Sequence, residues 1–214
     1  MKVVAVVPLK LNNERLQGKN TKRFDNGVPL LSYVLNTLRQ VKGLDEIVIY
    51  CSDASISEFA TDGVTYVKRS VSLDQSTTKI NEVLQAFAAD VPADIYVLVH
   101  ATAPFLKATT IQTGLDAVLG GQNDSALTVQ KLQEFIWKDS TPLNYDLNNI
   151  PRTQDLPPYF VETSGLYIYK KDWMVDHGRR IGDSPLLISV GKIEAVDIND
   201  PVDFDIANAL ANKM

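Results

Sequence analysis

Apolar and polar residues alternate in blocks along the first 125 positions of the chain. Short apolar runs rich in β-branched residues predict strands, and the segments between them carry apolar residues at helical spacing. The predicted strands are residues 3–7, 46–51, 64–68 and 95–100, and the predicted helices are residues 30–41, 77–89 and 109–119. This alternation predicts βαβ units and therefore an α/β protein with a mostly parallel sheet. Right-handed crossovers would gather the loops that follow the strands at one edge of that sheet.

The rhythm changes after residue 125. Residues 125–130, 135–138, 160–169, 185–190 and 194–198 predict short strands, with a polar break at 163–165, and residues 171–178 predict a short helix. Residues 139–158 are rich in Pro, Asn and Asp and predict a long loop, a feature that is often functional in a compact domain. Asp200 and Pro201 suit the N-cap and first position of a final helix. We expect one domain over residues 1–214, with a loop-rich extension at about residues 132–180.

Composition narrows the function classes. The 214 residues are 45% hydrophobic and 22% charged, as in an ordinary globular protein, and the formal net charge of -5 argues against a nucleic-acid partner. No apolar run approaches the ~20 residues of a membrane span. The apolar run after Met1 and Lys2 is too short for a secretory signal, so we expect a cytoplasmic protein that does not bind membranes. A single cysteine, Cys51, excludes an internal disulfide and a Cys-rich zinc site.

The loop after the first predicted strand is unusually basic. Before Asp25 it holds one acid, Glu14, and five basic residues, Lys10, Arg15, Lys19, Lys22 and Arg23. Ligands of open α/β sheets bind beyond the carboxyl ends of strands, so local positive charge on an acidic chain indicates an anionic ligand. The loop lacks the glycine order of a P-loop or a dinucleotide fingerprint, and phosphate binding would depend on side-chain cations. The alternative is a solvated loop with ordinary surface lysines.

A second candidate group lies near the end of the chain. Asp197 and Asn199 alternate along a predicted strand, so both side chains point to one face. Mg²⁺ is usually held by one or two carboxylates together with substrate phosphates, and these oxygen ligands suit it. The alternative is a strand end followed by a helix cap.

Two further polar groups could bind a substrate. His100 and Thr102 come just after the apolar residues 95–99 of a predicted strand, among small residues that let a ligand approach the backbone. Ser164 and Gly165 lie in the polar break of a later strand, and Arg152 precedes it and could pair with a carboxylate. Each of these residues could instead be structural or exposed to solvent. Because no catalytic triad order or Cys–His pair is evident, the candidates fit phosphoryl or nucleotidyl transfer, which needs positioning and charge neutralisation.

Five segments, in chain order, resemble motifs of the CMP-acylneuraminate and CMP-Kdo synthetase superfamily. Residues 7–20 match its opening motif, roughly Ile-Pro-Ala-Arg-x-x-Ser-Lys-x-x-x-x-Lys-Asn, without gaps. Residues 27–31 match Gly-x-Pro-Leu-Leu, residues 98–105 resemble Leu-Leu-Gln-Pro-Thr-Ser-Pro-Leu, residues 163–168 resemble Asn-Gly-Ala-Ile-Tyr-Ile, and residues 197–204 resemble Asp-Ile-Asp-Thr-Pro-Glu-Asp-Leu. Together the segments span nearly the whole chain, so the resemblance is fairly specific.

The resemblance implies a three-layer α/β/α nucleotidyltransferase fold of Rossmann type. It also implies a homodimer, with the extension used for dimerisation and sugar binding. The expected reaction joins CTP to a nine-carbon 2-keto-3-deoxy sugar acid, giving a CMP-sugar and pyrophosphate, with Mg²⁺ as cofactor. The alternatives are a nucleotidyltransferase for another nucleotide or sugar, and a non-catalytic relative that binds nucleotide sugars.

The resemblance also assigns site residues by position. The catalytic group is Lys10, Arg15, Lys19 and Asp197; the nucleotide site is Pro8, Leu9, Lys10, Asn12, Lys19, Asn20 and Thr78; the sugar site is His100, Thr102, Arg152, Ser164 and Gly165; and the metal ligands are Asp197 and Asn199. Four positions depart from the family pattern. Lys10 replaces an arginine, Glu14 a lysine, His100 a glutamine and Asn199 an aspartate, and Arg15 could compensate for Glu14. Glu14 and Asn199 are the features that favour the non-catalytic alternative.

Overall fold

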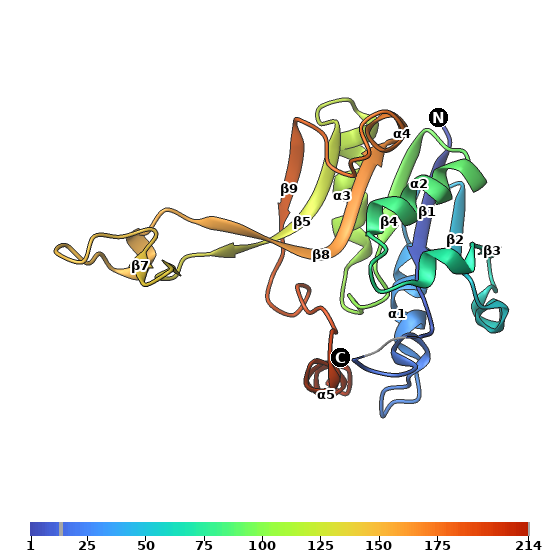
Figure 1. Ribbon diagram of the computed structural model, residues 1–214, viewed down its shortest axis with the longest axis horizontal. Helices are drawn as coiled ribbons and strands as arrows, with labels where there is room; N and C mark the ends of the chain where they lie inside the picture. Colours follow the sequence, from blue (N-terminus) through green and yellow to red (C-terminus); the bar gives the residue numbers. More distant parts are fainter. Residues whose placement is uncertain (13–14, 214) are drawn as a thin grey trace.

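A seven-stranded sheet forms the centre of the protein, and the computed structural model describes residues 1–12 and 15–213. The strand order is β3-β2-β1-β4-β8-β5-β9 (Figure 1). The strands are β1 (Val3–Pro8), β2 (Glu46–Cys51), β3 (Val64–Lys68), β4 (Ile95–Val99), β5 (Ser125–Leu132), β8 (Tyr159–Lys170) and β9 (Pro185–Ser189). Within this sheet only β8 is antiparallel to its neighbours, β4 and β5. The mostly parallel sheet is therefore confirmed.

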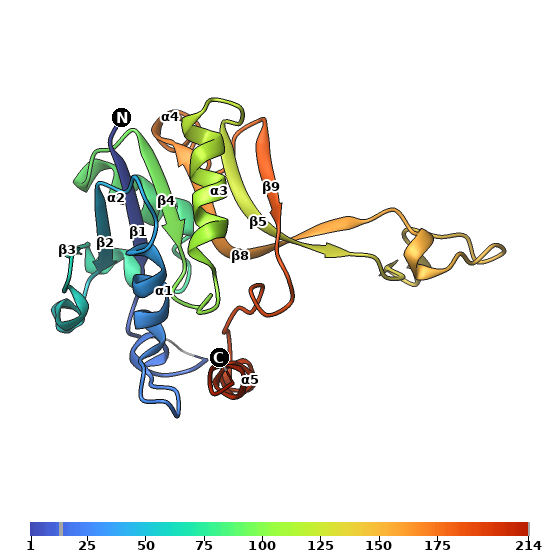
Figure 2. The same ribbon diagram turned by 180° about the vertical axis from the view of Figure 1, so that it is seen from behind.

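Helices cover both faces of the sheet, as the resemblance implied. Figure 2 shows α1 (Leu30–Leu38) and α3 (Ala108–Leu119) on one face, and Figure 1 shows α2 (Ile80–Asp90) and α4 (Lys171–Val175) on the other. The apolar stripes of α1 and α3 pack in one buried cluster and those of α2 and α4 in a second. Because it lies between these two layers, β1 is buried along its whole length, which explains its uninterrupted apolar run.

Several predicted elements have different bounds or a different form. Residues 194–198 are not a strand, because Val196 N donates to Ile193 O in a turn and the chain then continues without regular structure. Residues 163–165 do not interrupt β8, since a register shift between Leu127 and Val129 of β5 lets pairing continue past them. Only Trp137–Lys138 of the predicted strand 135–138 is a strand, β6. The helices predicted to reach residues 41 and 178 end at Leu38 and Val175.

An arm formed by residues 133–158 projects from the sheet between β5 and β8 (Figure 1). It contains β6, which pairs with β7 (Thr141–Pro142), and the short 3-10 helix η4 (Thr153–Asp155). The arm is narrower than the extension expected at residues 132–180, because residues 159–180 build β8, α4 and the turn after it. It carries several exposed large apolar side chains, namely Phe135, Trp137, Leu143, Leu147 and Ile150.

The last helix, α5 (Pro201–Ala211), lies below the carboxyl ends of the parallel strands (Figure 1). Its predicted N-cap is confirmed, since Asp200 Oδ1 accepts a hydrogen bond of 3.0 Å from Asp203 N and Pro201 begins the helix. Phe204 and Ile198 pack with Phe24 and Phe105 in a third buried cluster that ties the end of the chain to the early loops. Among the described residues, no helix is long and apolar enough to cross a membrane.

Candidate active site

A cavity of about 300 Å³ opens at the carboxyl ends of β1, β3 and β4. Its walls combine the end of β1, the segment after β3, the start of α2 and the residue after β4. The lining residues are Pro8, Leu9, Lys10, Arg69, Leu73, Gln75, Ser76, Thr78, Ile80, Val83 and His100. Five residues predicted to bind nucleotide or sugar, Pro8, Leu9, Lys10, Thr78 and His100, therefore come together at one site. We call it the nucleotide cavity below, after the ligand that the sequence predicts for it.

Hydrogen bonds fix the first loop against the segment after β3. Lys10 Nζ donates to Asp74 O at 3.2 Å, and Asn12 Nδ2 donates to the same oxygen at 3.5 Å. Asn20 is buried and its Nδ2 donates to Lys10 O at 3.0 Å. Asn20 therefore shapes the loop from within, and the loop holds Lys10 at the cavity wall.

Arg69 lines the same cavity and was missed by the sequence analysis. It is 4% exposed, and a guanidinium nitrogen forms an ion pair of 2.6 Å with Asp74 Oδ1. Its Nε has no hydrogen-bond partner among the described residues. Its position in the sequence could have identified it, because Arg69 directly follows the predicted strand 64–68, just as the basic loop follows the first strand. A buried, constrained cation at a cavity wall suits an anionic or carbonyl-bearing ligand.

Lys19 lies beside the two predicted metal ligands, because it is hydrogen-bonded to the backbone of Ile198 between them. Lys19 Nζ donates to Ile198 O at 2.7 Å, and Ile198 N donates to Thr102 O at 2.9 Å. Asp197 and Asn199 flank Ile198, and Asn199 Nδ2 donates to Asp197 Oδ2 at 2.9 Å. The predicted residues Lys19, Thr102, Asp197 and Asn199 are thus adjacent, although the strand expected to align the last two does not form.

The surroundings of Lys19 shift the pKa of its ammonium group. Burial lowers the pKa of its ammonium group, and the neighbouring Asp197 carboxylate opposes that shift. The charge of Arg15 lowers the pKa further, so Arg15 is near enough to act on the same group although its own side chain is exposed. Glu14 lies outside the described residues.

The donor set at Asp197 and Asn199 fits a half-complete Mg²⁺ site. The described residues contain no group of three or more His, Cys, Asp or Glu side chains that could hold a metal ion by themselves. Mg²⁺ demands six oxygen ligands but keeps several waters and relies on substrate phosphates, so one carboxylate and one amide oxygen are compatible with it. We therefore expect an ion here only together with a phosphate-bearing ligand.

His100 presents an unused nitrogen at the cavity. Its Nε2 is buried without a hydrogen-bond partner among the described residues. Burial, followed by the charge of Arg180, lowers the pKa of the imidazole to about 4, while Asp197 opposes the shift. His100 is therefore neutral at pH 7 and can accept or donate one hydrogen bond at Nε2.

Gly165 supports the loop that carries His100. His100 N donates to Gly165 O at 3.2 Å, and a Cβ added at Gly165 would lie 3.0 Å from the Ala103 Cβ. Glycine therefore permits the close approach of β8 to this loop. Ser164 beside it is exposed and has a φ of 59°, in the left-handed region that turns the strand at the register shift.

Arg152 is not brought to this site within the chain. It lies on the arm, its side chain is 72% exposed, and it forms an ion pair of 2.7 Å with Asp155. The hydrogen bonds to both Asp155 carboxylate oxygens keep the guanidinium on the surface of the arm.

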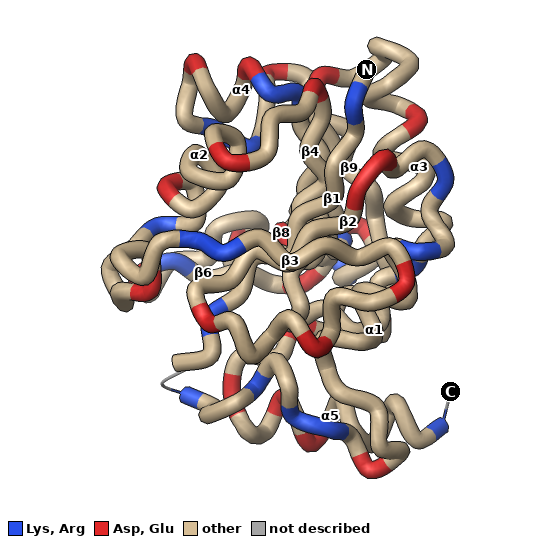
Figure 3. The backbone as a smooth tube through the Cα atoms, turned by 90° about the vertical axis from the view of Figure 1, so that its right-hand side faces the viewer, with Lys and Arg blue, Asp and Glu red and all other residues tan. Residues whose placement is uncertain are grey.

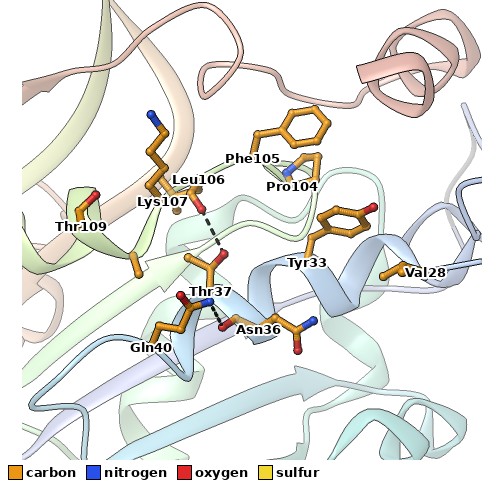
Figure 4. Close-up of a pocket in the computed structure, with 11 residues that line it drawn as sticks. Val28, Tyr33, Asn36, Thr37, Gln40, Pro104, Phe105, Leu106, Lys107 and Thr109 are labelled. Atoms are coloured by element: carbon orange, nitrogen blue, oxygen red, sulfur yellow. Dashed lines mark hydrogen bonds between the residues drawn. The ribbon is translucent and has the colours of Figure 1, made fainter. Parts of the chain in front are cut away.

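A larger cavity, of about 560 Å³, lies elsewhere, between α1 and residues 104–109 (Figure 4). Tyr33 and Phe105 line it, and Thr37 Oγ1 donates to Leu106 O at 3.1 Å. None of the predicted site residues lines it. Figure 3 shows Lys and Arg interspersed with Asp and Glu along the backbone. The nucleotide cavity is distinguished by the buried guanidinium group of Arg69 and not by its volume.

Comparison with known proteins agrees with this geometry. The family model described as cytidylyltransferase matches residues 4–187. The chain belongs to the cytidylyltransferase family. It is a nucleotidyltransferase, as the resemblance implied. The matched span includes the nucleotide cavity of this cytidylyltransferase but ends before Asp197.

Two curated relatives are each 25% identical to this cytidylyltransferase. One is N-acylneuraminate cytidylyltransferase of Oncorhynchus mykiss, matched over 79% of this chain and 41% of that protein, so the chain spans less than half of it. The other is CMP-N,N'-diacetyllegionaminic acid synthase of Legionella pneumophila, matched over 98% of this chain and 96% of that protein.

Solved structures share the fold of this cytidylyltransferase at low identity. A CMP:2-keto-3-deoxy-manno-octonic acid synthetase complexed with CTP superposes with a TM-score of 0.75 at 15% identity, covering 100% of this chain and 99% of that one. A 4-diphosphocytidyl-2C-methyl-D-erythritol synthase from Anaerococcus prevotii superposes with a TM-score of 0.68 at 14% identity, covering 99% and 96%.

Proposed function

We propose that this cytidylyltransferase transfers CMP from CTP to a sialic-acid-like nonulosonic acid and releases pyrophosphate. The observation that carries the proposal is that basic side chains held by burial or hydrogen bonds lie at the same edge of the sheet as Asp197. Lys10 and Arg69 line the nucleotide cavity, and Lys19 lies beside Asp197. The names of both curated relatives and the CTP complex of a structural neighbour support the same reaction.

In the proposed reaction the anomeric hydroxyl oxygen of the sugar acid attacks the α-phosphorus of CTP. A new oxygen–phosphorus bond forms, the bond from the α-phosphorus to the bridging oxygen breaks, and pyrophosphate leaves with that electron pair. The hydroxyl proton passes to water. Lys10, Arg15 and Lys19 would stabilise the negative charge on the departing phosphates, which is the main demand of such a transfer.

Asp197 and Asn199 would hold Mg²⁺ together with the phosphates of the nucleotide. The ion would neutralise triphosphate charge in the transition state. Lys19 donates a hydrogen bond to Ile198 O, between these two residues, and its remaining N–H groups would bind the same phosphates. His100 Nε2 and Thr102 would face the sugar, because both lie on the loop after β4 beside the nucleotide cavity.

We further propose that the arm mediates a homodimer. Its exposed apolar side chains would be covered by a second copy, and such patches commonly mark protein interfaces. In a dimer formed through the arm, the arm of one copy would extend toward its partner. Arg152 could then bind a substrate carboxylate at the site of the second copy, although it does not reach the site of its own chain.

Pyrophosphate release measures the proposed reaction directly. Purified protein is incubated with each of the four nucleoside triphosphates and with N-acetylneuraminic acid, N,N'-diacetyllegionaminic acid or Kdo, with Mg²⁺ or with EDTA. We expect release with CTP, at least one of the two nonulosonic acids and Mg²⁺, and none when any of the three is left out.

Calorimetry separates the enzyme from a non-catalytic relative. Binding of CMP that is independent of Mg²⁺, combined with no pyrophosphate release from any acid, would contradict the proposal and support a nucleotide-sugar binding protein. Release with Kdo alone would move the substrate class from nine-carbon to eight-carbon acids.

A further inference from the structure

A second cavity, of about 470 Å³, adjoins the nucleotide cavity. Lys79, Ile80 and Asn81 at the start of α2, Glu162 on β8, and residues 179–182 line it. Ile80 lines both cavities, so the two share a wall. We call this second space the acceptor cavity, because a ligand in it would be in reach of a ligand in the first.

Arg180 is held in place at the acceptor cavity. Its guanidinium carbon lies 3.9 Å from the centre of the Tyr167 ring, and the side chain is half-buried. Stacking on an aromatic face fixes the plane of a guanidinium group and leaves its N–H donors at the edge for a ligand. Tyr167 is itself fixed, because its hydroxyl donates to Glu162.

Arg180 also lacks a carboxylate partner. It forms no ion pair with any carboxylate of the described residues, whereas its neighbour Arg179 pairs with Asp183 at 3.0 Å. Glu162 is the acidic residue at the cavity wall, and its carboxylate is engaged by the Tyr167 hydroxyl. Lys79 adds a second positive charge on the α2 side. The cavity therefore keeps a positive excess that an anion would neutralise.

The position of Arg180 relative to His100 matters chemically. Arg180 stacks on Tyr167, and Tyr167 pairs with Leu98 of β4, two residues before His100. In keeping with this arrangement, the charge of Arg180 contributes to the lowered pKa of His100. His100 lines the nucleotide cavity with an unpartnered Nε2. In a 2-keto sugar acid the carboxylate and the attacking hydroxyl are bonded to the same carbon. A group that binds the carboxylate must therefore lie within a few bond lengths of the point where the hydroxyl meets the nucleotide.

We propose that Arg180 binds the carboxylate of the acceptor sugar acid. This inference rests on the proposed function and names a binding residue for it. A planar guanidinium with free N–H donors matches a carboxylate bidentately, and the shared wall places the adjacent hydroxyl near His100. Arg152, the carboxylate partner expected from the sequence, remains on the arm of its own chain and can serve only a second copy.

Kinetics on matched variants tests the assignment. We compare Arg180→Met and Arg180→Lys with Lys42→Met, which removes a positive charge at an exposed position outside the acceptor cavity. The assay is pyrophosphate release with whichever of N-acetylneuraminic acid, N,N'-diacetyllegionaminic acid and Kdo the wild type uses. We expect KM for the acid to rise about 10-fold or more in Arg180→Met, as for loss of a charge-assisted hydrogen bond, and less in Arg180→Lys. KM for CTP should stay within about twofold in all variants, since the nucleotide site is intact.

A modified acceptor gives a second, independent readout. The methyl ester of the acid should be a poorer substrate than the acid for the wild type, and the two should be equally poor for Arg180→Met. Equal effects of Lys42→Met and Arg180→Met, or a parallel rise in KM for CTP, would overturn the assignment. If the wild type releases pyrophosphate with none of the acids, the proposed function itself fails, whereas an active wild type with an unchanged KM in Arg180→Met removes only this inference.

Discussion

Lys19 is the most constrained of the basic residues in the first loop. Its Nζ donates to Ile198 O at 2.7 Å, and burial lowers its pKa while the Asp197 carboxylate opposes that shift. The ammonium group is therefore positioned before any ligand arrives, and binding phosphate requires little reorganisation. By contrast Arg15 is exposed and acts at longer range.

Replacing Lys19 by Met should lower kcat/KM for CTP by about 10-fold to 100-fold. The change removes a charge-assisted hydrogen bond worth about 1.5–3 kcal/mol, while the methionine keeps the packing of the side-chain stem. Lys19→Arg should retain more activity than Lys19→Met, and Lys42→Met, at an exposed position, should match the wild type. Steady-state pyrophosphate release measures all three, and wild-type turnover by Lys19→Met would remove its role at the phosphates.

The predicted site residues that line the nucleotide cavity share one local signal. Pro8, Lys10 and His100 follow buried apolar runs, and strand ends gather at one edge whatever the strand order. Arg69 carries the same signal, but it is a single basic residue after its strand, whereas the first loop holds five. Arg180 gave no local signal, because it reaches the site only through its stacking on Tyr167 of a distant strand.

At the scale of elements, the arm exposes large apolar side chains that a single copy of the chain leaves uncovered. Trp137 and Leu147 are 52% and 56% exposed, and they lie on a projection whose own strands, β6 and β7, have two residues each. A two-stranded hairpin of this size is only marginally stable in water, so packing against another surface would stabilise it.

Charged substitutions on the arm test this expectation. The wild type should sediment as a dimer, and Trp137→Glu combined with Leu147→Glu should shift it to monomer, because an interface does not accept two unpaired carboxylates. Val175→Glu, at a similarly exposed apolar residue on α4, should leave the dimer intact. A wild-type monomer at assay concentrations would contradict the proposed homodimer.

The elements also show what hydrophobic patterning cannot predict. Residues 194–198 alternate like a strand, yet Ile198 packs with Phe204 and Phe105, and its two backbone groups bond to Lys19 and Thr102. The apolar positions were identified correctly, but the strand predicted from them was wrong. Likewise β8 continues through a polar segment because a register shift re-aligns it with β5, which depends on pairing and not on local composition.

At the scale of the whole molecule, the free energy of unfolding should depend on one buried imidazole. The pKa of His100 is lowered from 6.5 to about 4 in the folded state, so the unfolded chain takes up a proton first as the pH falls. Stability should therefore be full above pH 6.5 and decline toward pH 4. Linkage gives a loss of about 2 kcal/mol between pH 7 and pH 5 from this residue.

Denaturant unfolding of wild type and His100→Gln at pH 7 and pH 5 measures this dependence. The substitution should remove the loss assigned to His100, while His177→Gln, at an exposed histidine, should keep it. The groups that face His100 are Arg180 from the turn before β9, Asp197 from the segment before α5, and Lys19 from the first loop. A pH dependence unchanged in His100→Gln would show that folding does not lower the pKa of this imidazole.

The parallel arrangement of the first four strands could be predicted from the sequence, since consecutive βαβ units build one parallel sheet. The insertion of β8 between β4 and β5 could not, because it is set by pairings between residues far apart in the chain.

This single reversed strand has an evolutionary consequence. Since β8 runs against its neighbours, the connection from β5 to β8 leaves the sheet at the border where Pro8, Arg69 and His100 lie. Insertions or deletions in that connection leave the main pairing ladder of the sheet unbroken. Proteins of this fold can therefore differ in the arm while the residues that line the nucleotide cavity stay the same.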